Sequence, residues 1–105
     1  MKSQDRIKRI KDLEEKFDAA SRAVAELEKA LDDYSDVRED ISDLEEYMDS
    51  GAWMQDFEAD GRGEFPAGMK RGILSEDGLY NLLSDSDEVL RRMRSVAAKA
   101  AAGKR

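Results

Sequence analysis

Apolar residues in the N-terminal third of the chain recur at alternating steps of three and four, and this spacing limits the fold more than any other feature. The residues at these positions are Ile10, Leu13, Phe17, Ala20, Val24, Leu27, Leu31 and Tyr34. A heptad repeat of this kind forms one apolar stripe along a helix and is typical of coiled coils. We therefore predict a helix over residues 4–33, whose heptad seam from Ile10 to Tyr34 is about 36 Å long at about 1.5 Å per residue.

The phase of the apolar residues changes after this seam, which indicates a second helical segment. Ser35 or Asp36 can cap a new helix. We predict a break at this point because a helical hairpin would bury the seam, although a continuous helix with a local change of phase fits the same residues. The acidic helical segment over 36–60 is interrupted at Ser50–Gly51, so a short helix from Trp53 to Asp60 follows the interruption.

Glycine and proline punctuate residues 61–74, which we predict to be an ordered loop. Ser75 with Glu76 and Asp77 behind it is a favourable helix start, because a hydroxyl caps the first turn and acids suit the positive end of the helix dipole. The C-terminal helical segment over 75–102 follows. It carries a second capping signal at Asp85, where the helix can restart.

Composition excludes several classes of function. The chain has 105 residues, of which 41% are charged, and its net charge is −7. An acidic chain is a poor ligand for nucleic acid, and no apolar run approaches the roughly 18 residues of a membrane span. Without cysteine or histidine there is no disulfide, thiolate metal site or imidazole base. We expect a cytoplasmic protein that binds neither nucleic acid nor membrane and uses no cofactor.

Acidic and basic residues are concentrated in different parts of the chain. From Asp32 to Asp60 there are twelve acids and one base, whereas the residues from Val89 onward contain six bases and no acid. We expect the basic end of the chain to lie against the acidic middle, in preference to an external partner.

These observations predict an all-α fold in a single domain. A long coiled-coil-like N-terminal helix packs with shorter helices and with the ordered Gly/Pro loop. The second helix is about 20 Å long and too short to cover the seam alone. Because an exposed heptad seam needs a partner, we expect a homo-oligomer such as a dimer, or a complex with another protein, through Ile10–Tyr34.

The residues between the helical segments have an unusual composition. The stretch WMQDFEADGRGEFPAGMKRGILSED, from Trp53 to Asp77, contains the only tryptophan and the only proline of the chain. Six of the seven glycines lie between positions 51 and 78. Such residues are costly in a helical protein, so we infer that they hold an irregular backbone path.

With its flanks, from Tyr47 to Leu83, this stretch resembles the signature of a bacterial family of proteins of unknown function, DUF4298. At Gly61 the family pattern has an acid instead. The resemblance implies a helical N-terminal region and a segment of functional importance, without an established activity. The matching residues are Trp53, Asp56, Glu58, Asp60, Gly63, Pro66, Lys70, Arg71, Gly72, Leu74, Ser75, Glu76 and Asp77.

The residues themselves lead us to predict a surface that binds another protein, because ordered loops commonly carry binding function. Trp53 and Phe57 are four residues apart, and we expect them to form an aromatic cluster with Met54, Met69, Ile73 and Leu74. We expect the acids of this stretch to pair across the loop with its two bases. The candidate interaction surface comprises Trp53, Asp56, Phe57, Glu58, Asp60, Lys70, Arg71, Ser75, Glu76 and Asp77.

A divalent-metal-dependent phosphohydrolase is the alternative function, so the sequence leaves open whether the protein is an enzyme. Asp56 and Asp60 share one helix face with Glu64 close by, and carboxylates suit Mg²⁺, Mn²⁺ or Ca²⁺. Lys70 and Arg71 would then face the phosphate. A calcium loop of the EF-hand type is disfavoured because an alanine stands where the closing glutamate is required.

Overall fold

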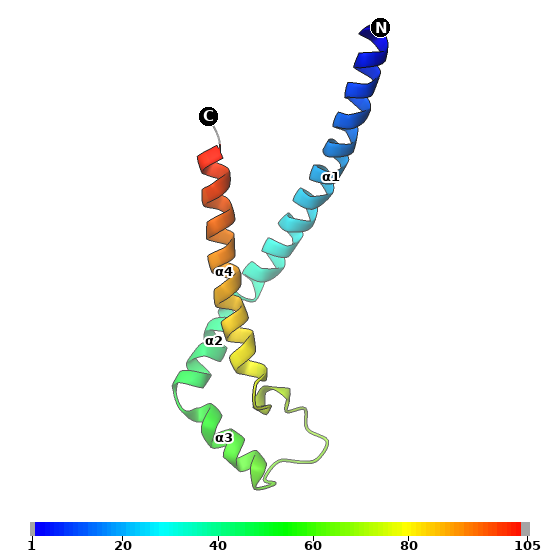
Figure 1. The fold of residues 1–105 in the computed structure, drawn as a ribbon. Coiled ribbons are helices and arrows are strands. Elements are labelled where there is room, and N and C mark those ends of the chain that lie inside the picture. The colour runs from blue at the N-terminus through cyan, green and yellow to red at the C-terminus, as the bar shows by residue number, and fades with distance from the viewer. Residues whose placement is uncertain (1, 104–105) are drawn as a thin grey trace. The chain divides into compact units, whose positions relative to one another are not determined.

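The computed structural model describes residues 2–103, which form four α-helices and one 3-10 turn (Figure 1). The elements are α1 (Lys2–Asp36), α2 (Arg38–Asp49), α3 (Ala52–Gly61), η1 (Gly72–Leu74) and α4 (Gly78–Gly103). No strand occurs in this part of the chain. The predicted all-α fold and long N-terminal helix are therefore confirmed. None of the helices within 2–103 combines the length and the apolar character needed to cross a membrane.

Internal contacts divide the chain into two units, residues 1–39 and 40–105. Most of the first unit is α1, and none of the described residues of α1 is buried. The predicted break after the seam is a single turn residue, Val37, whose N–H donates to the carbonyl of Tyr34 at 3.2 Å. Arg38 folds back over Tyr34, with its guanidinium carbon 5.6 Å from the ring centroid. These local contacts mark the change of phase that the sequence indicated.

The second unit is built around a small apolar core. Trp53 of α3, Leu74 of η1 and Leu79 of α4 are buried against one another, and Ile41 of α2 is also buried. Half-buried side chains from all parts of the unit complete the packing: Leu44, Tyr47, Met48, Phe57, Phe65 and Leu83. Since this core joins residues from before and after the loop, it fixes where the loop begins and ends.

Two glycines with positive φ bound α3. Gly51, with φ of 87°, precedes the helix, and Gly63, with φ of 75°, follows it. At the second boundary Gly63 N–H donates to Asp60 O (3.0 Å) and Glu64 N–H donates to Ala59 O (3.1 Å). This pair of bonds is a Schellman motif, which needs the left-handed conformation that glycine adopts without strain. The predicted stop of the helix near Gly61 or Gly63 is thus explained by Gly63.

The last helix starts with the cap that the sequence indicates, and it runs without a break to Gly103. Ser75 Oγ accepts a hydrogen bond from Gly78 N–H at 3.1 Å, three residues later, as a capping hydroxyl does. The predicted restart at Asp85 is wrong, because α4 is continuous from Gly78 to Gly103. Ser86, one residue further on, is buried within this unbroken helix.

Candidate functional site

Trp53 joins α3 to the end of the loop. Its side chain is only 8% exposed, and the indole Nε1–H donates to Ile73 O at 2.8 Å. The ring stacks on Phe57 with 5.0 Å between centroids and 16° between planes. Because an aromatic side chain buries a large area and indole has one strong donor, this single residue fixes both the packing and the position of η1.

Arg71 holds the loop at two further points. Its Nε lies 2.9 Å from Asp60 Oδ1 at the end of α3, and its Nη1 donates to Pro66 O at 2.8 Å. The two charged side chains are 30% and 29% exposed, so the ion pair is partly shielded from water. A guanidinium presents several donors in fixed directions, which lets one arginine bind a carboxylate and a backbone carbonyl together. The loop is ordered by these contacts, as predicted.

Tyr47 connects α2 to α3. Its hydroxyl donates to Asp56 Oδ2 at 2.6 Å. Burial, the hydrogen bond to the Asp56 carboxylate and the negative charge of that carboxylate, in decreasing order of effect, together raise the pKa of Tyr47 from 10.0 to about 12. All three effects disfavour an ionised phenolate beside an anion. The tyrosine is thus held as a neutral donor at the junction of the two helices.

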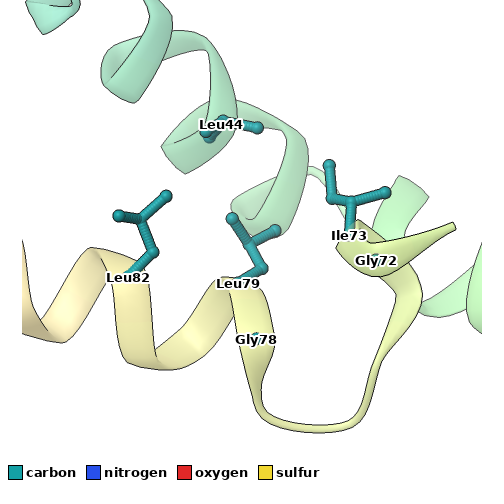
Figure 2. Close-up of a pocket in the computed structure, with 6 residues that line it drawn as sticks. All are labelled: Leu44, Gly72, Ile73, Gly78, Leu79 and Leu82. Carbon is teal, nitrogen blue, oxygen red and sulfur yellow. The ribbon is translucent and has the colours of Figure 1, made fainter. Parts of the chain in front are cut away.

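An apolar groove of about 310 Å³ lies beside these contacts. Figure 2 shows Leu79 and Leu82 pointing from α4 toward α2, where Leu44 lies, with Ile73 of η1 next to Leu79. Gly72 and Gly78 line the same groove and carry no side chain into it. The groove is therefore bordered by the segment that carries Trp53 and Arg71, and its lining is aliphatic.

Comparison with known protein families decides the relationship of this chain to others. A family model described as "Domain of unknown function (DUF4298)" matches residues 10–96, which is most of the chain. The chain belongs to the DUF4298 family. Neither the curated proteins nor the solved structures gave a match.

The structure brings together only part of the predicted surface of this DUF4298 protein. Trp53 and Phe57 stack, and Asp60 pairs with Arg71. The expected pairing of Asp56 with the loop bases is wrong, because this carboxylate binds the Tyr47 hydroxyl. The remaining predicted residues have exposed side chains and are Glu58, Lys70, Ser75, Glu76 and Asp77.

The composition of the aromatic cluster also differs from the prediction. Leu74 is buried against Trp53, as expected. Met54, Met69 and Ile73 are instead 52%, 43% and 40% exposed. The third buried member of the cluster is Leu79 of α4, which lies far along the sequence from Trp53.

The predicted metal ligands have other partners in this DUF4298 protein. Asp56 binds Tyr47, Asp60 binds Arg71, and Glu64 lies 2.6 Å from Arg62 Nε. Between residues 2 and 103 no group of three or more potential ligands is arranged to hold a metal ion. The metal-dependent phosphohydrolase therefore stays a prediction from the sequence.

The basic end of the chain has no ion pair with the acidic middle among the residues described. Arg91 pairs with Glu88 of its own helix at 2.6 Å, and no ion pair found in residues 2–103 joins α4 to α2 or α3. Within residues 2–103, the expected contact between the basic end of the chain and its acidic middle is thus not formed through salt bridges.

Sequence reasoning missed Tyr47 and the groove residues. Tyr47 stands at the start of the family-like stretch, but nothing in its spacing to Asp56 predicts a hydrogen bond between two helices. Leu44, Leu79 and Leu82 read as ordinary members of helical apolar stripes. Only the tertiary structure distinguishes these leucines, because it determines which positions of the apolar stripes η1 leaves uncovered.

Proposed function

We propose that this protein is a cytoplasmic protein-interaction module, which binds a protein partner at the apolar groove and the adjoining Trp53–Asp77 segment. The observation that carries the proposal is an irregular segment held in one conformation by Trp53 and Arg71, with aliphatic side chains exposed along its edge. A chain with 41% charged residues is suited to an aqueous compartment. Ordered loops of this kind are common binding surfaces.

The exposed apolar side chains support a docking role. Four apolar side chains are each between 40% and 52% exposed: Ile73, Met69, Leu82 and Met54. The small core would gain stability if it buried them. Covering the exposed halves of four such side chains contributes roughly 3–6 kcal/mol, at about 1.5–3 kcal/mol for each fully buried side chain. Association costs at least about 4 kcal/mol in lost freedom of motion. Apolar contact alone therefore gives weak binding, and a second attraction is needed.

Charge supplies that second attraction and defines the partner. Residues 40–60 carry eight acids and no base. Leu44, one of the residues that line the groove, belongs to this acidic stretch. The acids Asp43 and Glu46 also border a shallow hollow with Tyr47 on α2. A partner that places one or two apolar side chains in the groove and Lys or Arg beside it would complement both features.

A pair of matched substitutions on α4 tests this proposal. Leu82→Asp places a charge in the groove, whereas Val89→Asp places the same charge seven residues further along the helix, on a residue equally exposed (45% and 46%). Proteins captured from a bacterial lysate by the natural chain and by the two variants are compared by quantitative mass spectrometry. We expect Leu82→Asp to lose a specific set of proteins that Val89→Asp retains.

The captured set must also show the predicted chemistry. Its binding should weaken as salt is raised, because screening acts on exposed charges, and its contact segments, mapped by cross-linking, should combine aliphatic and basic residues. Trp53 fluorescence and circular dichroism verify that both variants are folded. Equal capture by the two variants, or capture that salt does not affect, contradicts the assignment of the surface.

A further inference from the structure

A second surface, distinct from the groove, runs along α1. The six large aliphatic and aromatic residues of the seam from Ile10 to Leu31 each keep between 40% and 66% of their surface exposed. No described residue of α1 is buried, and α1 makes up almost all of the unit 1–39. A regular apolar stripe over four heptads is larger than the scattered apolar residues of an ordinary surface, so it marks an interface.

We propose that α1 pairs with α1 of a second copy of the chain and that the two helices run antiparallel. The charges along α1 are polarised: residues 2–17 hold six bases and four acids, whereas residues 18–36 hold two bases and six acids. An antiparallel pair places each positive half beside the negative half of the other copy. A parallel pair places like halves together, which opposes association.

The sizes of the seam residues favour the same direction. With Ile10–Tyr34 fully overlapped and antiparallel, Phe17 lies opposite Leu27 of the second copy and Ala20 lies opposite Val24. In a parallel pair Phe17 lies opposite Phe17 of the second copy, and in the next layer Ala20 lies opposite Ala20. A wide layer next to a narrow one leaves a gap beside the alanines, and close-packed interfaces avoid such gaps.

Charges that flank the seam favour the parallel arrangement. It would bring Arg9 beside Glu14 of the second copy, since these residues flank the seam on opposite sides. The antiparallel pair places the two flanking bases, Arg9 and Lys16, near uncharged residues, and it brings Glu14 near Glu28 of the second copy. Exposed charge pairs of this kind contribute little to association, so the charge of whole helix halves and the seam layers determine the direction.

An antiparallel pair has a consequence for how the protein presents its groove. In the overlap above, Asp36 lies beside Lys8 of the second copy. The two Asp36 residues are then about 42 Å apart along the axis, at about 1.5 Å per residue. The unit 40–105 follows each of them, so the dimer displays two copies of that unit, joined by a rigid helical pair. Two linked sites bind a multivalent partner far more tightly than one.

Cysteine cross-linking tests the direction, because the natural chain has no cysteine. Leu13→Cys and Leu31→Cys chains are mixed in denaturant, refolded together and oxidised, and the linked peptides are quantified by mass spectrometry. In the proposed pair residue 13 faces residue 31 of the other copy. Since thiols with Cα atoms more than about 7 Å apart cannot be bridged, we expect about a tenfold excess of 13–31 links over both self-links. A majority of 13–13 and 31–31 links overturns the antiparallel arrangement.

Sedimentation equilibrium of the full chain tests the pairing itself. The natural chain should be dimeric at about 100 µM, and Leu27→Lys in the seam should weaken self-association by at least about tenfold. Ala25→Lys adds the same charge on the outward side of α1 and should leave the dimer intact. A natural chain that stays monomeric at this concentration, or an equal effect of both variants, overturns the proposal. Because these residues lie on α1, the result is independent of the partner proposed for the groove.

Discussion

Replacing Gly78 by alanine tests how the start of α4 is built. Gly78 N–H donates to the Ser75 hydroxyl, and a Cβ on residue 78 would overlap that same oxygen. The methyl group therefore displaces the hydroxyl and removes the cap, which costs about 1 kcal/mol. Replacing a helical glycine gains roughly 0.5–1 kcal/mol in return. The two effects nearly cancel, so Gly78→Ala alone should change the free energy of unfolding by less than about 0.5 kcal/mol.

The outcome differs when the hydroxyl is already absent. In a Ser75→Ala chain the cap is lost beforehand, and Gly78→Ala should then raise the free energy of unfolding by up to about 1 kcal/mol. The interaction energy between the two substitutions is thus about 1 kcal/mol in a double-mutant cycle. The Cβ would also lie 3.2 Å from Gly72 O, but this contact is present in both backgrounds and cancels in the cycle.

Urea unfolding followed by Trp53 fluorescence measures this cycle. Trp53 is the only tryptophan, and it is buried against Leu74, the residue before Ser75. Gly68→Ala serves as the control, because a Cβ there meets no atom within 4 Å, and its effect should be the same with and without the Ser75 hydroxyl. If the effects of the two substitutions at 75 and 78 add within about 0.3 kcal/mol, the methyl group at residue 78 does not displace the Ser75 hydroxyl.

Two further predictions follow from the site. Gly63→Ala should lower the free energy of unfolding by roughly 1–2 kcal/mol because φ is positive at this residue. Gly61→Ala, inside α3 with open space around it, should raise the free energy of unfolding by up to about 1 kcal/mol. Effects of the same sign would contradict the Schellman motif. Folding raises the pKa of Tyr47 to about 12, so the folded state retains the phenolic proton more strongly and stability falls as pH rises from about 10 through 12. In unfolding curves over that range Tyr47→Phe should lose less stability than the natural chain, and equal losses would show that the Tyr47 hydroxyl contributes nothing to the pH dependence.

Most features that depend on neighbours in sequence were predicted well, although the helix restart at Asp85 was not. The alternating steps from Ile10 to Tyr34 determine α1, because a 3.6-residue period places those side chains on one face whatever the rest of the chain does. The stop at Gly63 and the cap at Ser75 are equally local, since each satisfies backbone groups within five residues. The dense motif around Trp53 was enough to indicate the family.

The site depends on contacts that local spacing does not specify. Tyr47 reaches Asp56 across two helices, and Trp53 reaches the Ile73 carbonyl across the whole loop. Which acid would pair with Arg71 was undecided in the sequence, because three carboxylates stood at similar spacing and only Asp60 lies at the end of α3 beside the returning loop.

The sequence by itself determined the long N-terminal helix, the stop at Gly63 and the cap at Ser75, because each depends on backbone hydrogen bonding or periodicity over a few residues. Its motif around Trp53 indicated the family. Only the tertiary structure decided that Leu79 would be buried while Leu82, three residues later on the same helix, would be left half exposed in the groove. The two leucines have the same chemistry and the same helical preference. They differ in what lies opposite them, since the core around Trp53 covers the first and ends before the second.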